Sequence, residues 1–557
     1  MEPFEELVER FLDHEFEVSP VRASGLGLTD YDERLDDLSA DAFRRRDAED
    51  ERWLARFEGP EDPGGRADGL SFDERLDRDL ARSVLRGRRI LADWEEWRRD
   101  PTTYSGPIAN GVFGLFLHRL RPEPDLVDAA VARLEQVPRA LEQGRANLDP
   151  ALAHPLILER GAGSARGAAR YFRELVASEV EPGPDRDRLA AAGARAAGAL
   201  DGWVAFLEAL RERAGGTWRL GEERYSRLLR EREALAFDAR ELRERGRAEF
   251  DRLDAEMREL ARRARGTEDW VAVLRDADRD HPPTEEAMRA AYEAATDRAR
   301  RFLAETGLVT LPDGERCRVE PSPVFQRPIL GVASYMAPPS FADTLVGHFF
   351  VPFAPDGTPE AERRLRLSAN SHGHIPTTAA HEAYPGHHWH LVMRKLGASR
   401  LRRVFGTPYF NEGWALYAER VMRERGYFGD PIEELYHLKA TIFRAARIVV
   451  DTSLHLGEME HDAAVRFLVE RTATPEPTAR AEVGRYCAWP TQASAYLTGC
   501  LEVLRIRERF LARRGGAGLR PTEVPVGLLR EFHDAITSAG SLPLGLAERA
   551  VLERPPA

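Results

Sequence analysis

The chain has 557 residues, of which 43% are hydrophobic and 31% are charged, a composition typical of a soluble globular protein. Its 94 acidic residues outnumber its 81 basic residues, and the resulting net charge of −13 argues against a nucleic-acid partner. No apolar run approaches the roughly 20 residues that cross a bilayer, the first residues lack a signal-peptide pattern, and the three cysteines form no disulfide framework. We therefore expect a cytoplasmic protein with no nucleic-acid or membrane partner; its oligomeric state stays open.

Most of the chain has the hydrophobic periodicity of α-helices. Within residues 240–262, apolar side chains recur at steps of three and four, which places them on one helix face: Phe250, Leu253, Met257 and Leu260. Because comparable patterns fill much of the chain, we predict a mainly α protein.

The region from about 306 to 354 has a different character. It contains four short runs rich in β-branched or aromatic residues and bounded by Pro, Gly or Asp, at 308–311, 317–319, 329–335 and 348–353. Such runs predict a small β-sheet. Pro352 indicates that the last run is an edge strand, and an exposed edge can pair with an extended peptide.

A run of eight residues at 381–388, His-Glu-Ala-Tyr-Pro-Gly-His-His, has side chains suited to a metal site. Catalytic zinc sites commonly use two imidazoles and a carboxylate, with a fourth position left for water. On a regular helix the partner of His381 would lie four residues later, but that residue is Pro385. Pro385 and Gly386 together predict a kink or a bulge in the helix.

A bulge that absorbs two residues would return His387 to the face of His381. We therefore predict His381 and His387 as metal ligands, with His388 as the alternative and His390 less favoured. Glu382 projects about 100° around the helix from its neighbour, so it would flank the attacking water rather than the metal. This is the position of a general base.

The third ligand should come from a second helix, and residues 411–422 provide one. Trp414, Tyr417 and Val421 form its apolar stripe, whereas Glu412 and Glu419 share another face. We predict Glu412 as the ligand and Glu419 as the residue that orients a ligating histidine through its other nitrogen, with the reverse assignment left open. The expected cofactor is one Zn²⁺ ion, although other divalent metals fit the same ligands.

These two motifs, His-Glu-Ala-Tyr-Pro-Gly-His-His and Asn-Glu-Gly-Trp-Ala-Leu-Tyr-Ala-Glu, resemble the bacterial family DUF885. Further similar blocks extend the resemblance over nearly the whole chain: 27–35, 218–221, 447–455, 485–499, 532–534 and 542–544. The family is grouped with the gluzincin-type zinc metallopeptidases. The resemblance therefore implies a large helical, zincin-like metallopeptidase fold.

A zinc peptidase also needs a donor for the developing oxyanion. Tyr496 and His455 lie in blocks that resemble the family and are our candidates, although either could simply pack in the core. Arg485 could bind a substrate carboxylate through two hydrogen bonds, and Tyr335 could line the cleft.

The sequence thus predicts an N-terminal helical region over residues 1–215 and a helical catalytic region over 216–557, with the metal site within 381–419. The favoured function is a zinc-dependent peptidase that cleaves short peptides with Glu382 as general base. One alternative is a metal-dependent hydrolase of a non-peptide acyl compound in a biosynthetic pathway. The other is a non-catalytic helical protein that binds a metal.

Overall fold

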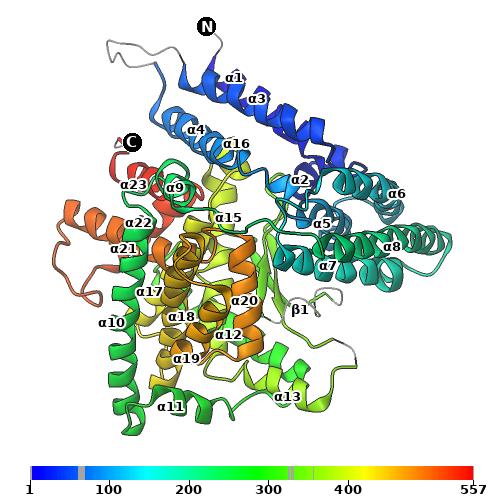
Figure 1. Ribbon diagram of the computed structural model, residues 1–557. Coiled ribbons are helices and arrows are strands. Elements are labelled where there is room, and N and C mark those ends of the chain that lie inside the picture. The colour runs from blue at the N-terminus through cyan, green and yellow to red at the C-terminus, as the bar shows by residue number, and fades with distance from the viewer. Residues whose placement is uncertain (1–2, 60–68, 324–326, 328–331, 356, 556–557) are drawn as a thin grey trace. The chain divides into compact units, whose positions relative to one another are not determined.

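The computed structural model describes residues 3–59, 69–323, 327, 332–355 and 357–555 (Figure 1). The contacts between residues divide the chain into two compact units. The first comprises Met1–Trp218, Pro323–Ile329 and Pro339–Thr344, and the second comprises Arg219–Ser322, Leu330–Pro338 and Leu345–Ala557. None of the helices in these described ranges combines the length and apolar character that crossing a bilayer requires.

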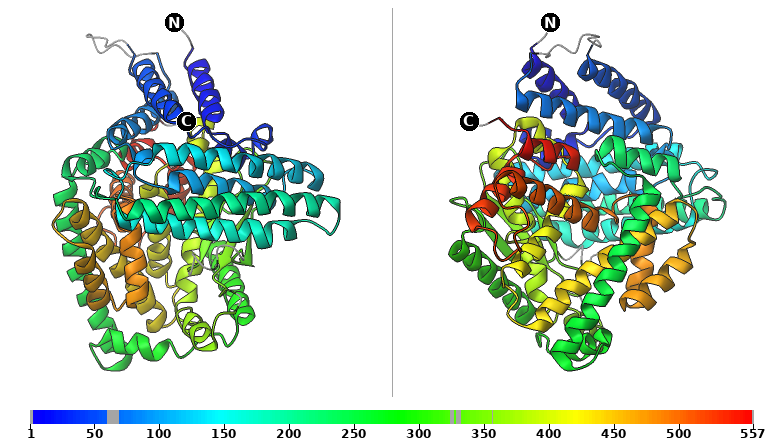
Figure 2. Two further views of the ribbon diagram at one scale, coloured as in Figure 1. Left: turned by 45° about the vertical axis from the view of Figure 1, so that its right-hand side comes forward. Right: turned by 90° about the vertical axis from the view of Figure 1, so that its left-hand side faces the viewer.

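The first unit is helical. Its α-helices are α1 (Phe4–Val18), α2 (Pro20–Gly25), α3 (Ala40–Glu58), α4 (Phe72–Ala92), α5 (Thr102–His118), α6 (Glu123–Asn147), α7 (Pro155–Arg170) and α8 (Pro184–Arg211). Short 3₁₀ or π segments lie at η1 (Thr29–Tyr31), η2 (Glu96–Arg98), η3 (Tyr171–Leu175) and η4 (Val176–Glu179). The long helix α8 packs along both α6 and α7 (Figures 1 and 2).

The second unit contains a small sheet and further helices. The helices before and around the sheet are α9 (Glu222–Arg227), η5 (Leu228–Arg232), α10 (Ala239–Arg265), α11 (Trp270–Ala277), α12 (Glu285–Thr306) and α13 (Glu360–Ser368). Those that follow are α14 (Ile375–Glu382), α15 (His387–Gly397), α16 (Arg400–Val404), α17 (Pro408–Glu424), α18 (Pro431–His455), α19 (His461–Thr472), α20 (Glu476–Ala488), α21 (Ala495–Arg513), α22 (Val526–Ser538) and α23 (Leu544–Leu552). The prediction of a mainly α protein with a small sheet is confirmed.

Helix α10 shows why the sequence forms these elements. The four side chains predicted to share one face, Phe250, Leu253, Met257 and Leu260, are all buried. The helix begins with a capping box in which Asp238 accepts from the amide of Glu241 and the Glu241 side chain accepts from the amide of Asp238. It packs along α18, the helix that later supplies side chains to the candidate site.

The sheet has three strands in the order β1–β3–β2, with bounds Arg316–Pro321 for β1, Val346–Val351 for β3 and Ser334–Met336 for β2. β1 runs parallel to β3, and β2 runs antiparallel to it. The prediction of an edge strand at 348–353 is therefore wrong, because β3 is central. The strand ends at Val351, so Pro352 removes no hydrogen bond from the ladder.

The predicted strand at 308–311 does not form either. Its backbone groups bond to side chains instead: the amide of Thr310 donates to Asp534, and its carbonyl accepts from the indole of Trp389. Leu308 and Val309 are nevertheless buried, which explains their apolar character. In the third predicted run, residues 329–331 lie outside the described residues.

Helices α17 and α21, which carry Glu412 and Tyr496, contact each other closely. A Cβ atom added to Gly413 would lie 2.5 Å from Gly499 Cα, and one added to Gly499 would lie 1.9 Å from the carbonyl oxygen of Tyr409. Only glycine fits at either position. This close packing fixes the two functional candidates relative to each other.

Candidate metal centre

The 381–388 motif spans the end of one helix and the start of the next. Helix α14 ends at Glu382 and α15 begins at His387, so the predicted bulge within one continuous helix is wrong. A Cβ atom on Gly386 would lie 1.9 Å from the carbonyl oxygen of His381, so the turn needs glycine there. The carbonyl of Pro385 accepts a hydrogen bond from the Trp414 indole at 2.8 Å, which ties this turn to α17.

The turn brings His381 and His387 together with Glu412 from α17. One ligand atom from each residue lies within 4.8 Å of the others. The Nε2 atoms of His381 and His387 are 3.6 and 3.3 Å from Glu412 Oε2, and the two imidazole rings are perpendicular. Two ligands bound at about 2.0–2.1 Å to a tetrahedral zinc lie roughly 3.3 Å apart. The three side chains therefore fit a zinc ion in both chemistry and spacing.

Without a metal, the charges of the triad stabilise one another. Burial lowers the pKa of His381, but the carboxylates of Glu412 and Glu419 outweigh it and raise that pKa to about 9. Burial raises the pKa of Glu412, yet His381 and His387 hold it well below its usual value. Glu412 is therefore ionised and suited to bind a cation.

Glu419 lies behind the triad and is fully buried. Its Oε1 atom is 2.7 Å from His381 Nδ1, and its Oε2 atom is 3.1 Å from His437 Nδ1. Arg444 Nη2 lies 3.9 Å from the same Oε1. Glu419 thus contacts the nitrogen of His381 that faces away from Glu412, which leaves Nε2 free to bind a metal.

Our sequence interpretation did not identify His437 or Arg444. They are seven residues apart on α18, two turns along one face, and both contact Glu419. That spacing is a signal in the sequence. It indicates a site only once α18 is known to pack beside α17, which no local pattern reveals.

Glu382, at the end of α14, is half-buried and next to the triad. Burial raises the pKa of its carboxyl, and the imidazoles of His381 and His387 partly offset this. Within the described part of the chain it has no hydrogen-bond partner, in contrast to Glu419. Its carboxylate is therefore available to exchange a proton.

Tyr496 lies beside His381. Its ring runs nearly parallel to the His381 imidazole, with centroids 6.5 Å apart. Gln492 Nε2 donates to the Tyr496 hydroxyl oxygen at 3.4 Å. The hydroxyl hydrogen takes no part in this bond and can be donated to another acceptor. Burial and the Glu412 carboxylate both raise the pKa of Tyr496, so the hydroxyl stays protonated.

Arg485 and Tyr335 lie close to the site but have partners. The Arg485 guanidinium donates to Glu482 at 2.9 Å and to Gln492. The Tyr335 ring stacks beside His387 at 6.5 Å, while its hydroxyl lies 2.8 Å from His388 Nδ1. The Tyr335 ring therefore lies beside the ligand His387, whereas Arg485 contacts Gln492, the partner of Tyr496, and no triad ligand among the described residues.

His388 points away from the triad. Its Nε2 atom lies 2.8 Å from Glu315 Oε2, which also accepts from the Tyr384 hydroxyl at 2.5 Å, while Arg300 donates to the other Glu315 oxygen. Both nitrogens of the ring are thus committed to hydrogen bonds. His390 is also buried, with Nε2 3.2 Å from Asn411 Oδ1.

His455 is not brought to the triad. It is the last residue of α18, 11 positions beyond Arg444, and so roughly 16 Å further along the helix. Its Nδ1 accepts from the amide of Leu220, and its Nε2 lies 3.0 Å from the carbonyl oxygen of Tyr486. The structure places this histidine in the core, and we do not retain it as an oxyanion donor.

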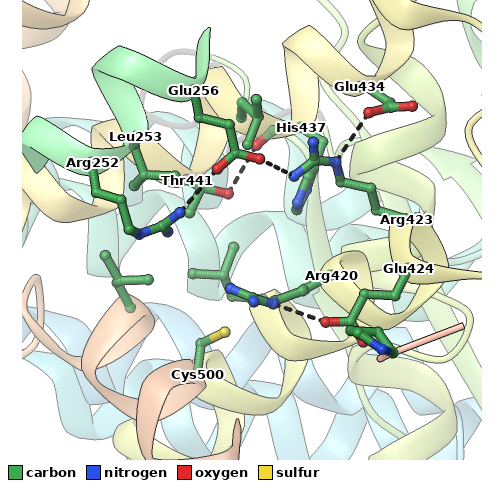
Figure 3. A pocket seen from close by; sticks show the side chains of 14 residues that line it. Arg252, Leu253, Glu256, Arg420, Arg423, Glu424, Glu434, His437, Thr441 and Cys500 are labelled. Atoms are coloured by element: carbon green, nitrogen blue, oxygen red, sulfur yellow. Dashed lines mark hydrogen bonds and ion pairs between the residues drawn. The ribbon is translucent and has the colours of Figure 1, made fainter. Parts of the chain in front are cut away.

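A cavity of about 390 Å³ is lined by residues that include His437 and Arg420, and by none of the triad residues (Figure 3). Figure 3 shows Arg423 paired with both Glu256 and Glu434, and Arg420 paired with Glu424. These arginines of the cavity thus pair with carboxylates that also line it. The cavity is separate from the ligand side of the metal centre.

Comparison with known families gives a match over most of the chain. A model of the family described as "Bacterial protein of unknown function (DUF885)" matches residues 20–551. A comparison with curated proteins finds no significant match.

Two solved structures are similar over nearly their whole length. One is described as "a putative lipoprotein of unknown function" from Shewanella oneidensis, with a TM-score of 0.76, 20% identity and 99% of each chain covered. The other, "the putative lipoprotein" from Colwellia psychrerythraea, has a TM-score of 0.80, 20% identity and 99% and 98% of the two chains covered. At this identity the likeness establishes a shared fold.

Proposed function

This chain belongs to the bacterial family DUF885, and we propose that it is a zinc-dependent metallohydrolase, in the first place a peptidase that cleaves short peptides. A zincin-like character of the helical fold is part of this proposal. The observation that carries it is the convergence of His381, His387 and Glu412, beside the Glu382 carboxylate, for which the described residues provide no hydrogen-bond partner.

The triad residues would hold the ion through two imidazole nitrogens and one carboxylate oxygen. A zinc ion supplies a Lewis acid that polarises the substrate carbonyl and activates water. Structural zinc sites usually have four protein ligands, whereas catalytic sites have three and an open position. The group of three found among the described residues therefore supports a catalytic rather than a structural site.

Glu382 serves as the general base in this scheme. It takes a proton from water as the water oxygen bonds to the carbonyl carbon, and it gives that proton to the nitrogen as the C–N bond breaks. A base in this position typically contributes roughly 10²- to 10⁴-fold in rate. The raised pKa of Glu382 suits both halves of this exchange.

Tyr496 donates a hydrogen bond from its hydroxyl to the oxyanion that develops on the substrate. Its ring lies beside His381, and its oxygen already accepts from Gln492, which orients the hydroxyl. Loss of one such donor typically costs about 3–4 kcal/mol in transition-state stabilisation.

Metal analysis combined with a peptide screen tests the proposal. Purified protein is stripped with a chelator, reloaded with one equivalent of Zn²⁺, and incubated with a mixed library of short peptides read by mass spectrometry. We expect about one bound zinc per chain and cleavage that needs it. Absence of stoichiometric zinc, or cleavage unaffected by the chelator, would overturn the proposal.

The cytoplasmic location expected from the sequence stays a prediction. The two similar structures carry the word lipoprotein in their descriptions, and at 20% identity that description applies to those proteins alone.

A further inference from the structure

Three arginines lie near Tyr496. Arg444 and Arg447 are one turn apart on α18, and Arg485 is on α20. The guanidinium carbons of Arg444 and Arg447 lie 5.5 and 4.8 Å from the Tyr496 ring centroid. Because that ring lies beside His381, this arginine cluster (Arg444, Arg447 and Arg485) adjoins the metal centre.

In the described part of the chain, the cluster has more arginines than directly paired carboxylates. Glu482 Oε2 accepts from Arg447 at 2.7 Å and from Arg485 at 2.9 Å. Glu419, which lies 3.9 Å from Arg444, already bonds to two histidines. Among the described residues, these three guanidiniums thus make direct ion pairs with only two carboxylates, and one of the two, Glu419, is committed to the metal centre. An additional anion could therefore pair with the cluster.

The unused hydrogen-bond donors are on Arg444 and Arg447. Arg444 Nε is buried and has no hydrogen-bond partner within the described residues, and Nη2 makes only the long ion pair to Glu419. Arg447 donates from Nε to Tyr486 and from Nη2 to Glu482, and its Nη1 has no hydrogen-bond acceptor in the described part of the chain. Arg485, by contrast, uses both of its Nη groups on Glu482 and Gln492.

Arg444 also lies close to the metal centre. Its Nη2 atom is 3.9 Å from Glu419 Oε1, the oxygen that bonds to the ligand His381. The same guanidinium faces the Tyr496 ring. Arg444 is therefore close to both the metal centre and the proposed oxyanion donor, which is where the end of a short substrate would lie.

From these contacts we propose that Arg444 and Arg447 bind the free C-terminal carboxylate of a peptide substrate, so that the enzyme acts as a carboxypeptidase. This rests on the proposed function and specifies its substrate class. Each residue spans about 3.3–3.6 Å, so a carboxylate one or two residues beyond the scissile bond would reach past Tyr496 to these guanidiniums. Arg485 is a positioning residue that holds Gln492 and Glu482.

A matched pair of peptide pools tests this inference. One library of N-acetylated hexapeptides is made with free C-terminal acids and again with C-terminal amides, and cleavage is followed for the zinc-loaded wild-type protein, Arg447→Met and Arg444→Lys. Arg480→Met is the control. Arg480 lies on α20, the helix that carries Arg485, but it makes an exposed ion pair with Glu476. Zinc content is measured in every variant.

We expect the wild-type protein to cleave acids at least about tenfold faster than amides, as loss of a charge-assisted hydrogen bond predicts. The preference should approach unity in Arg447→Met, mainly through KM, weaken in Arg444→Lys, and persist in Arg480→Met. Equal cleavage of both pools by the wild-type protein would overturn the carboxylate site while leaving the hydrolase intact.

Binding gives a readout that does not depend on turnover. Zinc-loaded Glu382→Gln protein is equilibrated with each pool, and the retained peptides are quantified by mass spectrometry. Preferential retention of acids, lost on adding Arg447→Met, supports the carboxylate site even if the wild-type protein cleaves nothing. Equal retention of acids and amides, or retention of neither, would contradict it.

Discussion

His387 and His388 are adjacent in sequence but belong to two different groups of side chains. The metal triad joins His387 to His381 and Glu412, whose carboxylate lies 3.3 and 3.6 Å from the two imidazoles. The network around His388 joins it to Glu315 and Tyr335 through hydrogen bonds of 2.8 Å. Charge-assisted hydrogen bonds are normally about 2.7–2.9 Å, so only the second group is closed within the protein.

The two groups also differ in charge. In the triad, carboxylates raise the pKa of His381 to about 9, whereas burial lowers the pKa of His388 despite its contact with Glu315. The first arrangement attracts a cation, and the second holds a neutral ring in the core. The comparison teaches that the number of histidines in a motif does not give the number of ligands.

The largest expected difference is in the zinc content of two variants, His387→Ala and His388→Ala. Loss of His387 removes one of three ligands, so we expect the protein to lose its stoichiometric zinc. Loss of His388 should leave zinc in place but destabilise the fold by about 3 kcal/mol, because Glu315 loses a buried partner. Mass spectrometry of bound metal and urea unfolding measure the two effects, and zinc loss in both variants would contradict the separation.

The second comparison is between two carboxylates, Glu382 and Glu315. We expect Glu382→Gln to keep zinc and lose roughly 10²- to 10⁴-fold in turnover, because the general base is gone. Glu315→Gln should retain most turnover and lose stability instead. Steady-state kinetics on the reloaded variants would decide; an active Glu382→Gln protein would show that the base lies elsewhere.

The third comparison is between Glu412 and Glu419, which lie on the same helix. Glu419→Gln should reduce zinc affinity by about 10- to 100-fold, the usual effect of removing a group that orients a ligating histidine. Glu412→Gln should have a larger effect because it removes a ligand. Competition with a chelator gives both affinities, and an equal loss in the two variants would argue for two carboxylate ligands.

Much of this arrangement could be predicted from the sequence because it depends on short spacings. The pairing of His381 with His387 follows from the Pro385–Gly386 step, and the seven-residue spacing of Glu412 and Glu419 follows from helix geometry. Both are local. The sequence predicts a kink or a bulge at Pro385–Gly386, whereas the structure has a break between α14 and α15. A Pro-Gly pair indicates that a helix is distorted but does not indicate how far the distortion extends.

The remainder depends on contacts between distant segments. His455 is of a residue type that often acts in catalysis. In the structure, however, both of its ring nitrogens contact backbone groups in the core, those of Leu220 and Tyr486. Arg447 begins the block 447–455 that resembles the family, but the sequence assigns a role to neither Arg447 nor Arg444. Their position beside Tyr496 follows from the packing of α18 against α21, which no local periodicity encodes.

The smallest expected effect concerns His533, a second neutral buried histidine. Its Nε2 lies 2.7 Å from the hydroxyl of Tyr417, on the helix that carries Glu412, and its Nδ1 lies 2.8 Å from the carbonyl oxygen of Leu308. Burial lowers the pKa of His533 to about 3. The unfolded chain, with a histidine pKa near 6.5, therefore binds a proton below pH 6.5 that the folded chain does not.

Stability that His533 contributes is thus present above pH 6.5 and is lost as the pH falls toward 3, by about 1.4 kcal/mol per pH unit. Between pH 6 and pH 4, the unfolding free energy of the wild-type protein should fall more steeply than that of His533→Gln by this amount. Urea unfolding at several pH values, with zinc content as a control, measures the difference. Parallel pH profiles would mean that folding does not lower the pKa of His533, and that its burial beside the metal-binding helix does not keep it neutral.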